Sequence, residues 1–433
     1  MIIHVVSPGE TAYAIALEYG VSLELLRINN GLGAGAPLSV GQALLILFPG
    51  KTHLVGLGET LASIAAEHGV SLRDLYQNNL VLGGQPAIWP GQTLIISYQD
   101  APSGPLFVGG YAYPFISPAL LRQTLPFLSA LMPFTYGISA EGRLLPLNDE
   151  ALLSAARLHG VQAMMHLSSL TEEDTFSTER AAMVLTQAAL QAAFIEEVVE
   201  TILEKGYRGI DVDFEFLGGE NAAPYAAFVA ALRRALLPYG YPVVVALAPK
   251  TADDQQGLLY EGHDYSALGQ AADAVLLMTY EWGYTYGPPM AVAPLPSVRR
   301  VVEYALTRIP REKLILGIPN YGYDWPLPFV RGETKAQSIS NVRAVELAFA
   351  NNAAISFDET AQAPHFFYRA PDGTEHEVWF EDVRSMLAKY DLIKEYGLMG
   401  AGYWNLMRPF PANWMLLRSQ FQIRTSPLTS TQL

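Results

Sequence analysis

The chain has 433 residues, a formal net charge of −15 and no cysteine. This length predicts two or three domains, and the lack of cysteine excludes disulfides, thiol catalysis and cysteine metal sites. The acidic balance, with no long Lys/Arg cluster, argues against nucleic acid as a partner. No apolar stretch reaches the roughly 18–20 residues of a membrane span. The eight histidines form no His-x-x-x-His or His-Glu-x-x-His pair, so we expect no metal and no cofactor.

The N-terminal segment Met1–Val6 has neither a basic leader nor a cleavage site, and sequence of structured character follows it directly. We therefore expect a protein without a conventional signal peptide. Such a protein either stays in the compartment that makes it or reaches its target by another route.

The first hundred residues contain an internal repeat with an offset of 49 residues. Such a period indicates repeated structural units. Each copy is predicted to fold as a short strand, two helices and a short closing strand. Threonine and serine residues stand where they can cap the helices, and glycines stand where the first helix ends. The corresponding segments are Ser7–Thr11 with Gly56–Thr60, Gly20–Leu23 with Gly69–Leu72, and Asn29–Asn30 with Asn78–Asn79.

The motifs Pro-Gly-Glu-Thr, Ile-Ala, Gly-Val-Ser, Asn-Asn and Val-Gly-Gln, varied slightly in the second copy, make both copies resemble LysM modules. The resemblance implies two modules, 1–49 and 50–98, that bind glycans containing N-acetylglucosamine, including peptidoglycan and chitin. It places the sugar between the first strand–helix loop and the second helix–strand loop. A small α/β domain with an unknown ligand is the alternative. The residues assigned to these loops are Gly9, Thr11, Asn30, Gly58, Thr60 and Leu80.

After a short linker, 99–105, eight apolar runs alternate with amphipathic segments across 106–425. Strands separated by helices in this way predict an α/β fold, a (β/α)8 TIM barrel. A flat, doubly wound sheet is the alternative, but its glycine-rich phosphate loop is missing. The predicted strands are 106–113, 130–136, 162–167, 209–216, 243–248, 274–280, 314–319 and 398–404, and the longest helix is predicted at 178–205.

The gap before the eighth strand is longer than one helix and its loops need. We interpret residues 338–380 as a small α+β insertion, with a helix at 341–351 followed by short strands, which forms one wall of a cleft. Pro371–Gly373 is a good hairpin turn within it. The Ser- and Thr-containing residues 426–433 are predicted to be a frayed tail.

Three carboxylates occupy every second position of the run Gly209–Phe216. In a strand, Asp211, Asp213 and Glu215 project to the same face. Their crowding is expected to raise the pKa of at least one of them, and a general acid near neutral pH needs a raised pKa. A solvated strand face is the alternative, but the long helical segment before the run favours a strand buried in a parallel sheet.

Aromatic and polar residues follow or end most of the other predicted strands. In a barrel of this kind the working residues lie at the C-terminal ends of the strands. Aromatic faces stack on sugar rings and acids act on the glycosidic bond, so the sequence predicts a sugar site. We expect His166 to be an interior histidine with its hydrogen bonds satisfied. The other residues expected at the site are Tyr113, Met278, Tyr280, Glu281, Tyr321 and Trp404.

The motif Gly209–Glu215, the triplet Met278–Tyr280 and the pair Tyr403–Trp404 resemble motifs of family 18 glycoside hydrolases. The resemblance covers Leu106–Arg424. It implies a retaining glycosidase without a protein nucleophile, because the 2-acetamido oxygen of the substrate attacks the anomeric carbon, an exception to the scheme with two catalytic carboxylates.

The resemblance also implies a role for each matched residue. Glu215 would protonate the leaving oxygen, and Asp213 would hold the acetamido N–H and stabilise the oxazolinium. Tyr280 would orient the acetamido oxygen, and Asp211 would tune Asp213 through a shared proton. Trp404 would form the floor under the scissile sugar. The other substrate-binding residues would be Tyr113, Glu281, Tyr321 and Met278.

Two positions depart from the family pattern. Arg208 stands where the family motif begins with an aspartate, so we expect a different pKa relay around Asp211. Glu281 replaces an aspartate at the sixth strand, which is expected to move the contact with the reducing-side sugar. Together with the two modules, the Tyr-Glu-Trp sequence at this strand resembles spore cortex-lytic N-acetylglucosaminidases of endospore-forming bacteria.

The leading hypothesis is a glycosidase that cleaves β-1,4 bonds of an N-acetylglucosamine polymer, namely peptidoglycan of the spore cortex. The resemblance implies a spore or cell-wall location without a conventional signal peptide. A chitinase or chito-oligosaccharide hydrolase is one alternative. A non-catalytic glycan-binding protein is another, although the presence of Glu215 and Asp213 argues against it.

Overall fold

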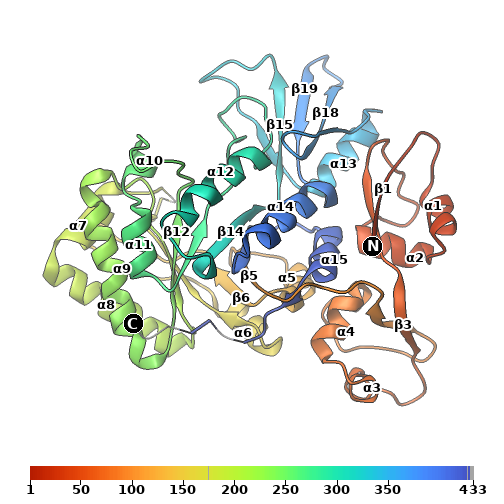
Figure 1. The fold of residues 1–433 in the computed structure, drawn as a ribbon, viewed down its shortest axis with the longest axis horizontal. Helices are drawn as coiled ribbons and strands as arrows, with labels where there is room; N and C mark the ends of the chain where they lie inside the picture. The colour runs from red at the N-terminus through yellow and green to blue at the C-terminus, as the bar shows by residue number, and fades with distance from the viewer. Residues whose placement is uncertain (174, 427, 430–433) are drawn as a thin grey trace.

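The structure is a computed structural model that describes residues 1–173, 175–426 and 428–429. Two small N-terminal modules lie on one flank of a larger α/β domain, and an antiparallel sheet projects from that domain (Figure 1). Residues 427 and 430–433 of the predicted tail lie outside the described residues. Leu428, within the same segment, is buried against the barrel interior.

The larger domain is a parallel barrel. Each strand pairs with the next one along the chain, and β20 pairs with β5 to join the last strand to the first. Between β6 and β11 the ring passes from β9 to β10, which are separated only by Met164. The prediction of a (β/α)8 barrel is confirmed. The strands are β5 (Pro105–Ala112), β6 (Ala130–Pro133), β9 (Gln162–Ala163), β10 (Met165–Ser168), β11 (Ile210–Asp213), β12 (Val243–Leu247), β13 (Ala274–Leu277), β14 (Leu314–Pro319) and β20 (Gly400–Trp404).

Helices surround the barrel because their apolar faces pack on the outward-facing residues of the strands. They are α5 (Pro118–Thr124), α6 (Glu150–Leu158), α7 (Thr178–Thr186), α8 (Ala188–Lys205), α9 (Ala222–Leu236), α10 (Leu258–Glu261), α11 (Tyr265–Ala271), α12 (Leu295–Leu306), α14 (Val383–Tyr396) and α15 (Pro411–Gln420). The minor elements are β7 (Gly137–Ile138), β8 (Leu144–Leu145), β21 (Gln422–Ile423) and the 3-10 turns η2 (Leu125–Phe127), η3 (Gly219–Asn221), η4 (Leu237–Tyr239) and η5 (Arg311–Lys313).

The prediction of one long helix at 178–205 is wrong. Gln187 has an extended backbone and separates α7 from α8, and the two helices are bent by 100°. At the break, the side-chain amide of Gln191 donates to the carbonyl of Leu185 at 3.1 Å, a partner of the kind that carbonyls at a helix end need. No single helix within the described residues is long and apolar enough to cross a membrane, and only this bent pair meets the length and composition criteria together.

The insertion before the last strand is a five-stranded antiparallel sheet covered by one helix. It begins earlier than the predicted 338–380, because β15 follows β14 almost directly and pairs with both β16 and β19. The helix prediction at 341–351 agrees with α13 to within one residue. The elements are β15 (Gly322–Leu327), β16 (Gln337–Ile339), α13 (Asn341–Ala350), β17 (Ser356–Asp358), β18 (Ala363–Arg369) and β19 (Glu375–Trp379).

The N-terminal modules share one architecture, a two-stranded antiparallel sheet with two short helices. The predicted caps are confirmed: Thr11 and Thr60 accept hydrogen bonds at the start of the first helix, and Gly20 and Gly69 end it in the left-handed conformation. The elements are β1 (Ile2–Val5), α1 (Ala12–Tyr19), α2 (Leu23–Asn30) and β2 (Ala43–Ile46), then β3 (Pro49–Leu54), α3 (Leu61–His68), α4 (Leu72–Asn78), η1 (Leu80–Leu82) and β4 (Thr93–Tyr98).

Both modules dock on the flank that α15 forms, through α2 and α4. In the first module, Ile355 N of the insertion donates to Val40 O at 2.8 Å. In the second, the side chains of Arg73 and Gln77 both donate to Pro126 O at 2.7 Å. These hydrogen bonds join the modules to the barrel domain as one packed body, so neither module is tethered only by the linker.

Candidate active site

Strand β11 carries both aspartates of the motif into the barrel. Asp211 is fully buried and lines a small interior cavity, and Asp213 lies at the floor of an open cleft. The strand ends at Asp213, so Glu215 stands just beyond its C-terminal end. The predicted alternation does not extend to Phe216, which has a φ of 56° and is exposed because the backbone has already turned out of the strand.

The backbone before Glu215 is fixed from behind. The ring of Phe214 stacks on that of Tyr225 with 5.6 Å between ring centroids. The backbone carbonyl of Phe214 accepts a hydrogen bond from His263 Nε2 at 2.9 Å. Ala248 N donates to His263 Nδ1 at 2.8 Å, so the proton of this imidazole must be on Nε2. These contacts hold the residue next to Glu215 in place and thereby direct the Glu215 carboxyl into the cleft.

Beneath the cleft, Asp211 belongs to a buried polar cluster. Tyr111 Oη donates to Asp211 Oδ2 at 2.7 Å. His166 Nε2 lies 3.7 Å from Asp211 Oδ2 and 3.6 Å from Asp213 Oδ2, and Thr135 Oγ1 contacts its other nitrogen at 2.6 Å. Burial raises the pKa of Asp211 to about 6, although His166 and the hydrogen bond from Tyr111 act to lower it. Asp211 therefore changes charge near neutral pH, next to Asp213.

Glu215 is the acid of the cleft. Burial raises its pKa well above the ordinary value, and the negative charges of Asp213 and Glu281 raise it further. A carboxyl whose pKa is raised in this way holds its proton to a higher pH than an ordinary glutamate. It can therefore donate that proton to an oxygen bound in the cleft.

Glu281 also lines the cleft, and two tyrosines hold its carboxylate. Tyr321 and Tyr323 both donate hydrogen bonds to its carboxylate, the latter at 3.1 and 3.2 Å. Burial raises the pKa of Glu281, and these two hydrogen bonds offset part of the effect. Burial also raises the pKa of the neighbouring Tyr280 well above 10. Its hydroxyl therefore stays protonated and can serve as a hydrogen-bond donor.

The cleft has a volume of about 420 Å³, and six of its thirteen lining residues are aromatic. Trp404, at the end of β20, packs against Phe134 at 4.8 Å and against Tyr113 at 6.2 Å between ring centroids. An aromatic surface combined with acids suits a sugar ring. The lining residues are Tyr113, Phe134, Leu170, Phe176, Asp213, Glu215, Pro249, Leu259, Tyr260, Met278, Tyr280, Glu281 and Trp404.

Most residues that the sequence assigned to the barrel site meet in this cleft. Two do not line it: Asp211 lies one layer deeper, and Tyr321 is 5% exposed behind Glu281. His166 is an interior histidine as expected, 1% exposed and hydrogen-bonded to Thr135 Oγ1, but its place between the two aspartates was not predicted. This placement follows from the register of β10 and β11, in which His166 and Asp211 are direct neighbours, and no sequence signal shows it.

Arg208 is remote from these acids. It precedes β11 at the opposite end of the strand, its side chain is exposed, and its guanidinium donates to Tyr241 Oη at 2.8 Å. Within the part of the chain that the structure describes, Arg208 therefore makes no contact through which it could alter the pKa relay around Asp211 in the way that the sequence had suggested.

The predicted glycan loops of the modules divide into two groups. Gly9, Thr11, Gly58 and Thr60 lie at the open start of the first helices, with the two threonine side chains used as caps. The other two predicted residues have structural side chains: Leu80 is 5% exposed, and the amide of Asn30 bonds Leu26 O and both backbone groups of Leu45. A ligand at those loops would contact the backbone instead.

The second loop of the first module also faces the catalytic domain. Residues 30–33 line a cleft of about 360 Å³ whose other walls are α13 and the start of α15. A Cβ at Gly31 would lie 3.1 Å from Pro411, which shows how closely the two domains approach.

Comparison with known proteins gives a consistent set of relatives. The family model described as glycosyl hydrolases family 18 matches residues 150–408, and the LysM domain model matches 4–46 and 53–97. The cortical fragment-lytic enzyme of Bacillus subtilis is 42% identical over 302 residues, which are 70% of each chain. That of Bacillus anthracis is 39% identical over 96% of this chain and 98% of its own. The crystal structure of the Bacillus cereus spore cortex-lytic enzyme SleL superposes with a TM-score of 0.83 at 36% identity, covering 98% of both chains.

Proposed function

The chain belongs to family 18 of the glycosyl hydrolases and carries two LysM domains, and from this premise we propose that it cleaves β-1,4 bonds of spore cortex peptidoglycan. The family makes it a glycosidase, and both parts of the chain bind glycan. The names of the relatives that align over nearly the whole chain support the cortex as substrate and the spore or cell wall as location.

The observation that carries this proposal is the pair Glu215 and Asp213 at the mouth of the barrel. Burial and neighbouring charge raise the pKa of Glu215, and the two acids share one cleft. Acids held in different environments on one site take different catalytic roles. Glu215 is the general acid that protonates the leaving glycosidic oxygen.

Asp213 serves the nucleophile that the substrate itself provides. Among the described residues, Asp213 Oδ1 is buried without a hydrogen-bond partner, and a buried acceptor of this kind calls for a donor. The N–H of a 2-acetamido group supplies that donor, and the carboxylate stabilises the positive charge that develops on the oxazolinium. Tyr280 donates to the acetamido oxygen and directs it at the anomeric carbon.

The remaining lining residues hold the sugars on either side of the cleaved bond. Trp404 presents an aromatic ring under the scissile sugar, and Tyr113 extends this surface. Glu281, fixed by Tyr321 and Tyr323, accepts hydrogen bonds from the reducing-side sugar. Tyr321 contributes by orienting Glu281 and makes no contact with the sugar.

The catalytic assignment is tested with Glu215→Gln. Loss of the general acid should lower kcat by about 10²–10⁴, while binding to insoluble cortex is retained because the modules are unchanged. Glu220→Gln, at an exposed carboxylate five residues further along, is the matched control and should leave both properties unchanged. Full hydrolysis by Glu215→Gln would show that another group is the acid.

The substrate is tested by mass analysis of the products. Cortex fragments should yield new N-acetylglucosamine reducing ends, and the same fragments after N-deacetylation should resist cleavage because they lack the internal nucleophile. A strong preference for chitin oligomers would contradict the peptidoglycan assignment. Cleavage of deacetylated glycan at an equal rate would contradict the substrate-assisted mechanism.

A further inference from the structure

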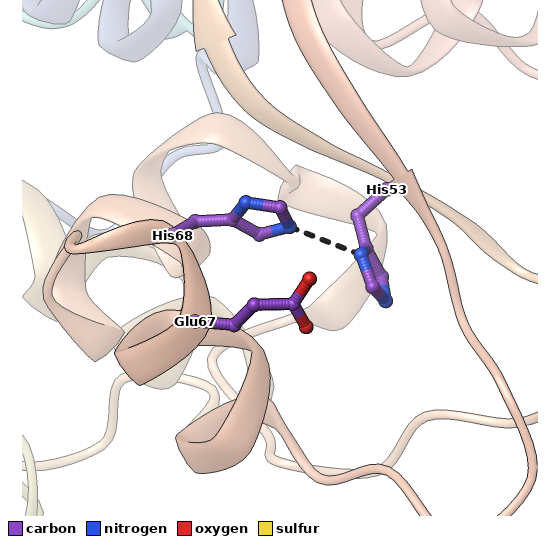
Figure 2. A group of neighbouring side chains, drawn as sticks. All are labelled: His53, Glu67 and His68. Carbon is purple, nitrogen blue, oxygen red and sulfur yellow. Dashed lines mark hydrogen bonds between the residues drawn. The ribbon is translucent and has the colours of Figure 1, made fainter.

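The second LysM module contains a cluster of potential metal ligands far from the catalytic cleft. His53 stands on β3, and Glu67 and His68 form the C-terminal end of α3. One donor atom from each of the three residues lies within 4.8 Å of those of the other two. Figure 2 shows both imidazoles and the Glu67 carboxylate turned toward one common space.

The orientation of His53 is set by a fourth residue. Glu59 Oε2 accepts hydrogen bonds from His53 Nε2 at 2.8 Å and from Gly56 N at 2.6 Å. A carboxylate oxygen that already accepts from a backbone N–H is an acceptor for the ring as well, so the imidazole proton is on Nε2. The lone pair of His53 Nδ1 is therefore left to face His68 Nε2, 3.0 Å away. A carboxylate behind a histidine is the arrangement that orients metal-binding imidazoles.

The first module supplies an internal comparison at the offset of 49 residues. His4 bonds Glu10 at 2.9 Å, as His53 bonds Glu59, but its Nδ1 faces the hydroxyl of Tyr19 at 3.1 Å. The His–Glu pair is therefore part of the architecture of both modules. Only in the second module does a histidine, His68, replace the tyrosine and add a second nitrogen ligand.

We propose that His53 Nδ1, His68 Nε2 and the Glu67 carboxylate bind one divalent transition-metal ion with a preference for imidazole, of which Zn²⁺ is the representative. Two imidazoles and a carboxylate suit such ions. Zn–N bonds of about 2.0–2.1 Å at a tetrahedral angle place two nitrogens about 3.3 Å apart, so the pair needs to open by only a few tenths of an ångström. The His68 proton moves to Nδ1, and water completes the coordination.

Common zinc motifs place two histidines close together on one helix, and no such pair occurs in the sequence. Here the histidines come from a strand and from a helix end, 15 residues apart. The bound ion would join β3 to the end of α3. These two elements flank the loop that carries Gly58 and Thr60, so the ion would stabilise this module and leave the catalytic cleft unchanged.

The test uses the full-length chain after removal of metal with EDTA, titrated calorimetrically with Zn²⁺ alone. One tight equivalent should bind to the unaltered chain and raise its thermal unfolding midpoint. His68→Tyr, which installs the side chain of the first module, should lose that equivalent. Glu59→Gln should weaken it by about 10–100-fold. Tyr19→His, next to Glu18, should create a second equivalent in the first module.

Two controls separate metal binding from other effects. Circular dichroism in EDTA should be the same for all variants, and if His68→Tyr does not fold, Glu67→Gln at an exposed position takes its place and should weaken binding. Hydrolysis of cortex fragments should be equal with and without Zn²⁺. The proposal is overturned if the unaltered chain binds no tight equivalent, or if binding is undiminished in His68→Tyr or, where that variant does not fold, in Glu67→Gln.

Discussion

Asp211→Asn should make the protein more stable and less active. Asp211 is fully buried, and its Oδ2 accepts one hydrogen bond, from Tyr111, which the amide oxygen of asparagine can also accept. Burial raises the pKa of Asp211 from 3.8 to about 6. Ionisation of the Asp211 carboxyl at neutral pH therefore destabilises the folded state. Asparagine has the shape of the protonated acid and carries no charge that would have to be buried.

The size of the effect follows from the difference between the two pKa values. At 1.36 kcal/mol per pKa unit, ionised Asp211 costs about 3 kcal/mol of unfolding free energy at neutral pH. Because the folded pKa is the higher one, the contribution of this group to stability is fully present below pH 3.8. It is lost as the pH rises through about 6. The gain from Asp211→Asn should thus be about 3 kcal/mol at pH 8 and only about 0.5 kcal/mol at pH 4.

The assay is urea-induced unfolding followed by tryptophan fluorescence at pH 4 and pH 8, for the variant and the unaltered chain. Asp391→Asn, at an exposed position on α14, is the control and should show no such difference between the two pH values. Hydrolysis by Asp211→Asn should fall, because the substitution removes the carboxylate that faces His166 Nε2 at 3.7 Å, and the same nitrogen lies 3.6 Å from Asp213. A stability change that is the same at both pH values would refute the argument that the Asp211 charge is costly.

Two further predictions follow from the structure. Glu281→Gln should shift the alkaline limb of the kcat/KM profile to lower pH, because the negative charge of Glu281 raises the pKa of Glu215; an unmoved limb would show that this charge does not reach the acid. Gly41→Ala should loosen the first module from the catalytic domain, since its Cβ would lie 1.9 Å from Ile355 O. Gly91→Ala in the second module has the same positive φ but open space around it, so it should cost only about 1 kcal/mol of backbone strain. Limited proteolysis and small-angle scattering compare the Gly41→Ala and Gly91→Ala variants. Equal protease sensitivity and equal scattering would contradict a role for the close approach of Gly41 to Ile355.

Several features were determined by the sequence alone because they depend on residues close together in the chain. The helix caps at Thr11 and Thr60 need only the next three residues. The offset of the repeat fixed the two modules, and the alternation of Asp211 and Asp213 on one strand fixed their common direction into the barrel. Alternation of strands with helices determined a parallel sheet, since parallel neighbours require such crossovers, whereas the pairing of β20 with β5 that closes the barrel is a tertiary feature.

Tertiary structure decided what depends on the packing of remote segments. Tyr321 orients Glu281 from behind, and His166 lies between the two aspartates, because adjacent strands set the depth of each side chain in the barrel. Arg208 was placed at the far end of its strand. His53 and His68 meet only because α3 packs its last turn beside β3. The spacing of residues along the chain does not predict these distances between side chains. They are set when whole helices and strands bury their apolar faces against one another.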